Sequence, residues 1–404
     1  MLNSNMNAAS PFSRPLYVML KPVGSRCNLS CRYCYYLEKA HYYDETADFR
    51  MSDAVLEEFV RQYLEAQTSS EVLFIWHGGE PLLCGLDFYM HALSLQQRYA
   101  GGMHIDNCIQ ANGTLITEEW CRFFKENNFL VGVSIDGPKH FHDAYRCRSY
   151  DAVVRGIELL NKHDVQWNAM AVVNNLNVEY PLEFYRFFRD ELNCRYLQFT
   201  PIVERVDEKG RFVIGNEEGK LTETSISSKQ WGAFLCAIFD EWVQHDVGEM
   251  FVQMFDATLA NWCGVPPGIC SLAPTCGHSA AMEHNGDLFS CDHFVFPQHL
   301  LGNIRTNSII SMMYGDQQKA FGLSKRNELT RQCKECQYLF ACNGECPKNR
   351  FTLDEYGNFG HNHLCAGYLR YFRHVSPAMD YMAEEWLAGR EVSSVMKNIK
   401  CIYQ

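Results

Sequence analysis

Three cysteines near the N-terminus have the spacing of metal ligands. Cys27, Cys31 and Cys34 directly follow the first predicted strand, with three and then two residues between them. Three thiolates on one short loop can bind three irons of a four-iron cluster, which leaves the fourth iron without a protein ligand. A structural zinc site or an electron-transfer cluster needs a fourth ligand nearby, but the next cysteine is Cys84. These three residues, the open triad, therefore predict a reactive cluster, with a zinc site or a chance spacing as the alternative.

Eight more cysteines crowd a C-terminal segment that has only short predicted elements. They are Cys270, Cys276, Cys291, Cys333, Cys336, Cys342, Cys346 and Cys365. Eight thiolates are enough for two fully ligated four-iron clusters. Two zinc sites are the alternative, because the Cys333-x2-Cys336 pair alone would fit zinc. The remaining cysteines show no ligand spacing, and Cys263 is the first of them to check because it closely precedes this segment.

The bulk composition argues against several functions. The chain has 404 residues, of which 47% are hydrophobic and 21% are charged, as in a globular protein. A formal net charge of −12 argues against a nucleic-acid partner, which needs a basic surface. We expect no membrane partner, because no apolar run is long enough to span a bilayer and the N-terminus has no apolar signal-peptide core. Nineteen cysteines in a chain too long to need disulfides predict a metal-binding protein of the reducing cytoplasm.

The elements that must position the open triad alternate between strands and helices. Predicted strands cover residues 16–21, 72–76, 104–110, 130–135, 166–173 and 196–200. Predicted helices cover residues 54–64, 118–127, 152–163 and 182–192. Ser52 and Thr117 stand where helix N-caps belong. Six such units predict an α/β fold whose parallel sheet curls into a full or partial barrel. In such a barrel the loops at the carboxyl ends of the strands carry the chemistry.

The chain divides into five predicted segments. A polar N-terminal segment covers residues 1–15, and the barrel covers residues 16–227, ending in a polar connection. A helical connection covers residues 228–262, an irregular two-cluster domain residues 263–367, and a helical tail residues 368–404. Asn285-Gly286 marks a hairpin turn within the two-cluster domain. So little regular structure there indicates a domain held by metal rather than by a large core.

Further motifs lie in the loops that follow the predicted strands. They are Gly78-Gly79-Glu80-Pro81, Gln110-Ala111-Asn112-Gly113, Ser134-Ile135-Asp136-Gly137 and His142-Asp143-Ala144-Tyr145-Arg146. Together with the open triad, these motifs resemble the signature of the radical S-adenosylmethionine superfamily. The resemblance implies a partial (β/α)6 barrel in which S-adenosylmethionine chelates the open iron. Its reductive cleavage would then yield a 5′-deoxyadenosyl radical.

The resemblance also implies which residues bind the cofactor. Tyr33 would lie against the adenine, to which Ile202 would offer backbone contacts. The turn containing Gly79 and Glu80 would meet the cofactor's amino group. His77 precedes this turn, at a position where relatives commonly carry Gln. We interpret it as a histidine near the cofactor whose hydrogen bonds are satisfied by its neighbours, and which could bear on the substrate pocket.

The cofactor's carboxylate has its own implied partners. By the same resemblance they are Ser134 and Arg146, because a hydroxyl and a guanidinium suit a carboxylate. A surface salt bridge is the alternative for Arg146, and Arg155 is a weaker candidate for its role.

The C-terminal cysteines resemble the twin-cluster domain of radical enzymes that modify peptides. In that family the ligand sets interleave, which implies two sets here. The first auxiliary set is Cys270, Cys276, Cys291 and Cys346. The second auxiliary set is Cys333, Cys336, Cys342 and Cys365. Three [4Fe-4S] clusters are therefore implied in total.

The sequences around two of these cysteines resemble a more specific family. The stretches 290–295 (SCDHFV) and 342–350 (CNGECPKNR) resemble anaerobic sulfatase-maturating enzymes, which convert Cys or Ser in a Cys/Ser-x-Pro-x-Arg motif to Cα-formylglycine. Asp292 falls at that family's catalytic base, although it could instead cap a turn. The implied partners are an extended sulfatase polypeptide and an electron donor such as a flavodoxin or ferredoxin. The alternatives are a radical enzyme that forms a cross-link or thioether and, from another class, a non-enzymatic electron carrier.

Overall fold

Six parallel strands form the centre of the molecule, as the sequence predicts. The structure, a computed structural model, describes residues 15–43 and 49–403. The polar N-terminal segment predicted for residues 1–15 therefore lies, except for its last residue, outside the described residues. The strands are β1 (Tyr17–Lys21), β2 (Glu71–Trp76), β3 (His104–Ala111), β4 (Leu130–Ser134), β5 (Trp167–Val173) and β6 (Tyr196–Pro201). Each pairs in parallel with the next, which confirms the partial (β/α)6 barrel.

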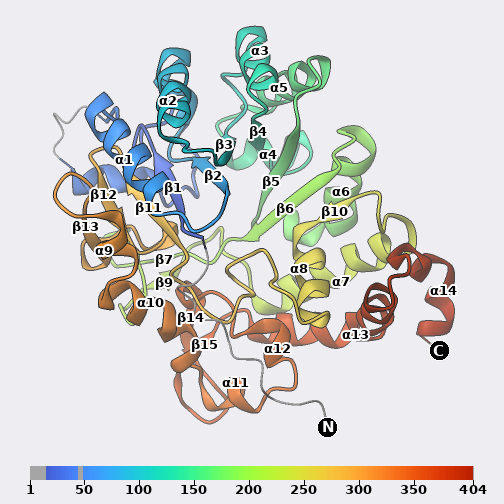
Figure 1. The fold of residues 1–404 in the computed structure, drawn as a ribbon. Helices are drawn as coiled ribbons and strands as arrows, with labels where there is room; N and C mark the ends of the chain where they lie inside the picture. The colour runs from blue at the N-terminus through green and yellow to red at the C-terminus, as the bar shows by residue number, and fades with distance from the viewer. Residues whose placement is uncertain (1–14, 44–48, 404) are drawn as a thin grey trace.

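Helices connect these strands along one side of the sheet (Figure 1). They are α1 (Asp53–Glu65), α2 (Leu86–Tyr99), α3 (Glu118–Glu126), α4 (Lys139–Tyr145), α5 (Tyr150–Lys162) and α6 (Pro181–Arg186). The hydroxyls of Ser52 and Thr117 accept backbone N–H groups of the first turns of α1 and α3, which confirms both predicted N-caps. Hydrophobic side chains between the helices and the sheet form one large core.

The helix predicted for residues 182–192 is interrupted. After α6 the chain continues as a π-helical turn, Phe187–Glu191. Phe187 and Phe188 are both buried in this turn, and their ring centres lie 5.3 Å apart. Sequence periodicity alone did not predict this local widening.

The cysteine-rich segment extends the central sheet beyond β1. Strand β11 (Ser279–Glu283) pairs in parallel with β1, with Lys21 opposite Glu283. Strands β12 (Asp287–Phe289) and β13 (Leu300–Asn303) follow in antiparallel order. The turn between β11 and β12 contains Asn285 and Gly286, which confirms the predicted hairpin. The carboxyl end of β1, where the open triad begins, therefore lies beside the first part of this segment (Figure 1).

Other short elements complete the fold. The polar connection forms a small sheet of β7 (Arg205–Val206), β8 (Phe212–Val213) and β9 (Lys220–Leu221). Strand β10 (Phe251–Val252) pairs with β6 at the other edge of the main sheet. Strands β14 (Arg350–Leu353) and β15 (Phe359–Asn362) form a separate hairpin. The remaining α-helices are α7 (Ser228–His245), α8 (Gln253–Trp262), α9 (Ile309–Met313), α10 (Asp316–Asn327), α11 (Arg331–Glu335), α12 (Leu339–Cys342), α13 (Cys365–Leu387) and α14 (Val395–Ile402).

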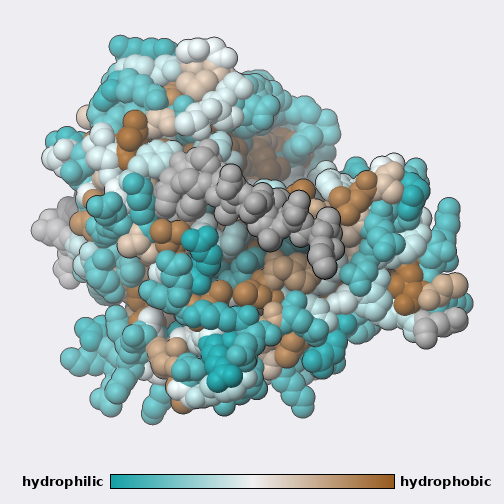
Figure 2. All heavy atoms as spheres, turned by 60° about the horizontal axis from the view of Figure 1, so that its bottom comes forward, coloured by the Kyte–Doolittle hydropathy of each residue, from teal (hydrophilic) through white to brown (hydrophobic). Residues whose placement is uncertain are grey.

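The long C-terminal helix α13 packs directly against α7. A Cβ atom added at Gly232 of α7 would lie 2.8 Å from the Cα atom of Gly367, so both positions require glycine for the two backbones to meet. Helix α13 begins at a cysteine of the second auxiliary set and continues into the predicted helical tail. Hydrophilic residues cover most of the face shown in Figure 2. Within the described ranges, no helix is both long and apolar enough to cross a bilayer.

Candidate functional site

The loop after β1 gathers the open triad. Cys34 donates its backbone N–H to the carbonyl oxygen of Cys31 at 3.0 Å, which folds the loop back on itself. The Asn112 side chain donates to the Cys27 sulfur at 3.6 Å. Burial raises the pKa of Cys27 and raises that of Cys31 to about 12, and the Cys34 thiol adds to both shifts. Thiols so placed ionise only where a cation compensates them, which fits the irons of a cluster.

The structure brings each predicted auxiliary set together. Burial raises the pKa of Cys291 well above its usual value, and the thiols that raise it further are Cys270, Cys346 and Cys276. Burial likewise raises the pKa of Cys365 to about 12, with Cys333 and Cys336 adding to it. The thiols of Cys365 and Cys333 in turn raise the pKa of Cys342. Eight thiols therefore form two groups with the interleaved membership that the resemblance implied, a donor set suited to two clusters.

The cysteines outside the two groups take no part in them. Cys263 is half-buried at the end of α8, and burial alone raises its pKa. Among residues 15–43 and 49–403, no three His, Cys, Asp or Glu side chains are close enough to hold one metal ion. In an iron–sulfur cluster each thiolate binds a different iron, so its ligands lie further apart than those of a single ion.

The glycine turn after β2 docks on the loop of the open triad. The N–H groups of Gly79 and Glu80 donate to the carbonyl oxygens of Gly24 and Arg26, each at 2.9 Å. A Cβ atom at Gly79 would lie 2.0 Å from the Arg26 oxygen, so only glycine allows this approach. The buried Glu80 carboxylate accepts the backbone N–H of Asn112 at 2.7 Å, and burial raises its pKa to about 7. The turn thus joins the loop of the open triad to the loop after β3.

Arg146 and Tyr33 share a carboxylate that the sequence analysis did not assign. Asp136, which is fully buried, accepts a hydrogen bond from Arg146 Nε at 2.9 Å and another from the Tyr33 hydroxyl. The Arg146 guanidinium also lies 5.6 Å from the centre of the Tyr33 ring. Ser134 accepts a hydrogen bond from Gln110 at 3.0 Å. Asp136 therefore fixes both predicted cofactor-binding side chains, and only its place in the motif after β4 could have indicated this role.

The other predicted cofactor residues separate into buried and exposed positions. Ile202 is buried and packs in one hydrophobic cluster with Tyr33 and Tyr145. Arg155 lies exposed on α5, whereas Arg146 is buried beside the open triad. The structure thus favours Arg146 over Arg155 for binding a carboxylate near the cluster.

Asp292 lies where the two cluster-binding regions meet. It directly follows Cys291 of the first auxiliary set. One of its oxygens forms an ion pair with Lys21, the last residue of β1. The other accepts a hydrogen bond at 2.8 Å from the hydroxyl of Tyr35, the residue after Cys34. One carboxylate therefore connects the loop of the open triad to the loop of a closed cluster.

The surroundings of Asp292 favour its ionised form. Burial is the largest single influence and would raise the pKa of this carboxyl group, and the nearby Lys21 ammonium is the strongest of the influences that oppose it. His77 and His293 act in the same direction, so the pKa lies below its usual value. Lys21 and Tyr35 were not identified from the sequence, because a strand-end lysine and a tyrosine beside a cysteine carry no specific signal.

His77 is held as a neutral acceptor beside this carboxylate. Its Nδ1 atom lies 3.1 Å from the Lys21 ammonium and 2.7 Å from the backbone nitrogen of Gly78. Both neighbours donate, so the hydrogen-bond pattern assigns the ring proton to Nε2. Burial, followed by the charge of Lys21, lowers the pKa of His77 to about 4. The imidazole therefore gains a proton only as the pH falls towards 4, well below the neutral range.

Replacing His77 with glutamine is expected to leave the pH profile of turnover unchanged between pH 6 and pH 8. A glutamine carbonyl oxygen can accept in place of Nδ1, and one hydrogen bond contributes about 1 kcal/mol, so the rate should fall by less than about tenfold. Initial rates across this pH range would be compared with those of a control, His104→Gln, at an exposed position. An ionisation near pH 6.5 that disappears only in the His77 variant would contradict the assignment.

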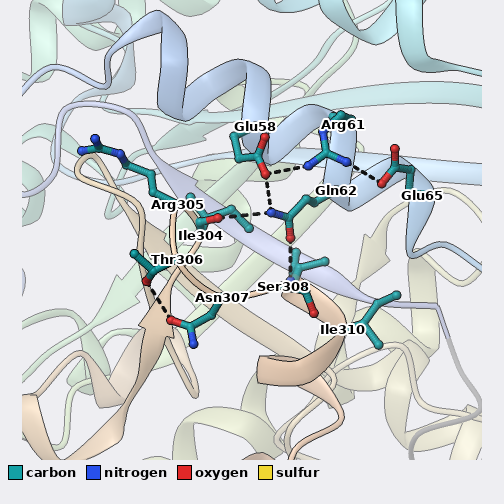
Figure 3. Close-up of a pocket in the computed structure, with 11 residues that line it drawn as sticks. Glu58, Arg61, Gln62, Glu65, Ile304, Arg305, Thr306, Asn307, Ser308 and Ile310 are labelled. Carbon is teal, nitrogen blue, oxygen red and sulfur yellow. Dashed lines mark hydrogen bonds and ion pairs between the residues drawn. The ribbon is translucent and has the colours of Figure 1, made fainter.

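Two cavities differ in their relation to these residues. One, of about 330 Å³, lies beside Arg32 and Tyr33 and is lined by Glu204, Glu223 and residues of β7, β8 and β9. The other, of about 340 Å³, lies between α1 and residues 304–310, away from every predicted site residue (Figure 3). Its polar side chains pair with one another and with the backbone, as Gln62 does with the carbonyl oxygen of Ile304 at 3.2 Å. Only the first cavity opens beside the open triad.

Known families match both halves of the chain. The profile of the "Radical SAM superfamily" matches residues 22–188, and that of an "Iron-sulfur cluster-binding domain" matches residues 274–337. The chain is 55% identical to a serine-type anaerobic sulfatase-maturating enzyme of Bacteroides thetaiotaomicron, over 97% of each chain. It is 29% identical to a cysteine-type anaerobic sulfatase-maturating enzyme of Clostridium novyi, over 92% of this chain and 98% of that one.

A solved structure agrees with these similarities. The structure described as "Native anSMEcpe with bound AdoMet and Cp18Cys peptide" superposes with a TM-score of 0.81 at 28% identity. The match covers 92% of this chain and 99% of that one, so it includes the barrel and the cysteine-rich segment.

Proposed function

Since the chain belongs to the family of anaerobic sulfatase-maturating enzymes, we propose that it oxidises a serine or cysteine of a sulfatase polypeptide to Cα-formylglycine in the absence of oxygen. The reaction uses S-adenosylmethionine and three [4Fe-4S] clusters. The open triad holds the cluster that binds the cofactor, and the two auxiliary sets hold the others. The target residue lies in an extended Cys/Ser-x-Pro-x-Arg motif.

The observation that carries this proposal is the position of Asp292 between two cluster loops. Its contact with Tyr35 joins it to the loop of the open triad, and its neighbour Cys291 belongs to the first auxiliary set. Formylglycine formation needs a hydrogen atom, a proton and an electron to leave one substrate residue. A base that adjoins both cluster sites can take the proton at the place where the other two leave.

The protein's own side chains divide this work. When bound, S-adenosylmethionine and the open cluster would provide the radical chemistry that removes the Cβ hydrogen atom. Tyr33, Gly79, Glu80, Ser134, Arg146 and Ile202 are proposed to bind and orient the cofactor. Asp292 takes the proton from the substrate hydroxyl or thiol, while Lys21 and Tyr35 hold its two oxygens in place.

We assign the cavity beside Tyr33 to the polypeptide. It is large enough for a side chain, and its wall carries the carboxylates of Glu204 and Glu223. Glu204 is already paired with Lys348 at 2.7 Å, which leaves the exposed Glu223 as the free acidic group. An acidic wall suits the arginine of the target motif.

We propose a small low-potential protein, such as a flavodoxin or ferredoxin, as the electron donor, because the open cluster must be reduced before it can cleave the cofactor. We also propose a cytoplasmic location. None of the nineteen cysteines, all of which lie in the described residues, forms a disulfide. Reduced thiols and oxygen-sensitive clusters suit a reducing compartment.

We infer that serine is the preferred target, because identity to the serine-type relative is 55% and to the cysteine-type relative 29%. Two peptides that differ only in Ser or Cys at the target would be incubated anaerobically with reconstituted enzyme, cofactor and dithionite. Peptide aldehyde and 5′-deoxyadenosine would be quantified in the same samples. The serine peptide is expected to give aldehyde with the larger kcat/KM.

The outcomes separate the alternatives. Cofactor cleavage without aldehyde on either peptide would contradict sulfatase maturation and favour cross-link or thioether chemistry. A protein that reduces its clusters but never forms 5′-deoxyadenosine would be an electron carrier. Aldehyde from the cysteine peptide alone would overturn the inferred preference for serine but not the reaction.

A further inference from the structure

Two buried cations lie beside the first auxiliary set. Lys325 of α10 is fully buried, and its ammonium donates to the carbonyl oxygens of Cys270 and Ser271 at 2.6 and 2.7 Å. Arg350 is 8% exposed, and its guanidinium donates to backbone carbonyl oxygens, among them those of Lys325 at 2.6 Å and Gly344 at 2.9 Å. These contacts fix both positive charges within the cysteine-rich segment.

Neither cation has a carboxylate partner within ion-pair distance in the part of the chain that the structure describes. A buried charge is costly unless a charge of opposite sign lies nearby. The nearby groups that can supply it are the thiolates of the first auxiliary set and the buried carboxylate of Glu345, which lies beyond ion-pair distance of both cations. Burial raises the pKa of Cys270 and Cys276, and Lys325 is the strongest influence opposing it at each, with Arg350 also acting on Cys276.

At the second auxiliary set, by contrast, the nearby charged side chains that act on its cysteines include two carboxylates. After burial, the charged groups that raise the pKa of Cys342 and Cys365 are other thiols and the carboxylates of Glu345 and Glu355. Glu345 is buried and accepts a hydrogen bond from Asn362 at 2.7 Å. The Glu345 charge also raises the pKa of three cysteines of the first set, so it affects both sites. What distinguishes the first site is chiefly Lys325, whose ammonium bonds the Cys270 carbonyl oxygen, because the charge of Arg350 also reaches His361 beside Cys333 of the second set.

We propose that Lys325 and Arg350 give the cluster of the first auxiliary set a higher reduction potential than that of the second. Reduction adds negative charge to a cluster, which a fixed cation nearby stabilises and a carboxylate opposes. The inference rests on the proposed function, because that function places a cluster at each set.

This order matches the place of Asp292. The first auxiliary set contains Cys291, the neighbour of this carboxylate. If the substrate radical is oxidised to the carbonyl compound, Asp292 would take the proton, and the cluster held by Cys291 and the rest of the first auxiliary set would be the acceptor beside it for the single electron. Lys325 and Arg350 make that cluster the more favourable acceptor of the two.

The test measures potentials rather than turnover. Enzyme with all three cysteines of the open triad changed to alanine would be reconstituted anaerobically, so that only the auxiliary clusters remain. Titration followed by electron paramagnetic resonance is expected to show two reduction steps. Lys325→Gln should lower the potential of the upper step and leave the lower one in place, whereas Lys325→Arg, which keeps the charge, should move neither. Glu345→Gln should raise both.

If Lys325→Gln fails to assemble the cluster of the first auxiliary set, a second variant shows which reduction step belongs to which cluster. Cys365→Ser changes one ligand of the second auxiliary set and should alter only the lower step. An altered upper step in this variant, or a lower step that moves in Lys325→Gln, would overturn the proposal. If the unaltered enzyme forms formylglycine but the two reduction steps of the triad variant occur in reverse order, this inference alone is refuted. A protein that holds neither auxiliary cluster would refute the proposed function, and the inference with it.

Discussion

Replacement of Asp292 with asparagine is expected to abolish formylglycine formation while cleavage of S-adenosylmethionine continues. Asparagine keeps the shape of the side chain and can still accept from Tyr35, but it cannot take a proton. Loss of a positioned general base lowers a rate by roughly 10²- to 10⁴-fold. Cofactor cleavage depends on the open triad and the residues around Arg146, whereas the hydrogen bond and the ion pair of Asp292 within the described residues go to Tyr35 and Lys21. Aldehyde and 5′-deoxyadenosine measured in one reaction would give the ratio of the two products.

The control for this variant is Asp316→Asn, an exposed carboxylate at the start of α10 in the same part of the chain. It should leave both products at their normal levels. Equal loss of aldehyde and 5′-deoxyadenosine in Asp292→Asn would indicate a damaged cluster site instead of a missing base. Normal aldehyde formation in that variant would remove Asp292 from the reaction.

The barrel could be predicted from sequence because its signals are local. The predicted strand 104–110 and the observed β3, His104–Ala111, differ by one residue at one end. Parallel strands covered by helices produce short apolar runs, and hydroxyl N-caps such as Thr117 mark where the next helix begins. Each signal needs only a few neighbouring residues to be recognised.

The pairing of β11 with β1 could not be predicted in this way. These strands are separated by the whole barrel in sequence, and a parallel pair needs no turn that would reveal it. Lys21 is an example of the consequence. A lysine at the end of a strand usually reaches solvent, whereas Lys21 is completely buried and its ammonium contacts His77, the Tyr36 ring and Asp292. The residues that surround a catalytic carboxylate therefore depend on long-range packing that the motifs do not encode.

The cysteine sets are an intermediate case. Their spacing indicated clusters, but only the resemblance to known families implied that Cys346 joins the first set while Cys342 joins the second. In the structure Asn343 and Glu345, both with positive φ, turn the chain between these two cysteines. The Cys342 thiol then lies near Cys365 and Cys333, whereas the Cys346 thiol lies near Cys276 and Cys270. Spacing alone would not have assigned them to different clusters.

Replacement of Lys21 with methionine is expected to destabilise the enzyme and nearly eliminate formylglycine. Methionine fills the buried space but removes the cation that pairs with Asp292 and lies 4.4 Å from the centre of the Tyr36 ring. Breaking a buried ion pair by removing one partner costs about 3–5 kcal/mol, because the other charge stays buried alone. Without Lys21 the pKa of Asp292 should rise, since burial is then opposed only by weaker neighbours. Denaturant unfolding of the anaerobic holoenzyme would measure the loss of stability.

A double-mutant cycle with Asp292→Asn separates the charge from the shape of Lys21. If the unpaired carboxylate causes the loss, Lys21→Met combined with Asp292→Asn should be more stable than Lys21→Met alone, although it removes one more native group. The coupling energy should be a large part of the cost of the single change, because Lys21 is fully buried and forms its ion pair directly with Asp292. Additive effects of the two changes would mean that Lys21 stabilises the fold by packing alone. In that case Lys21→Met would retain a substantial part of the aldehyde formation.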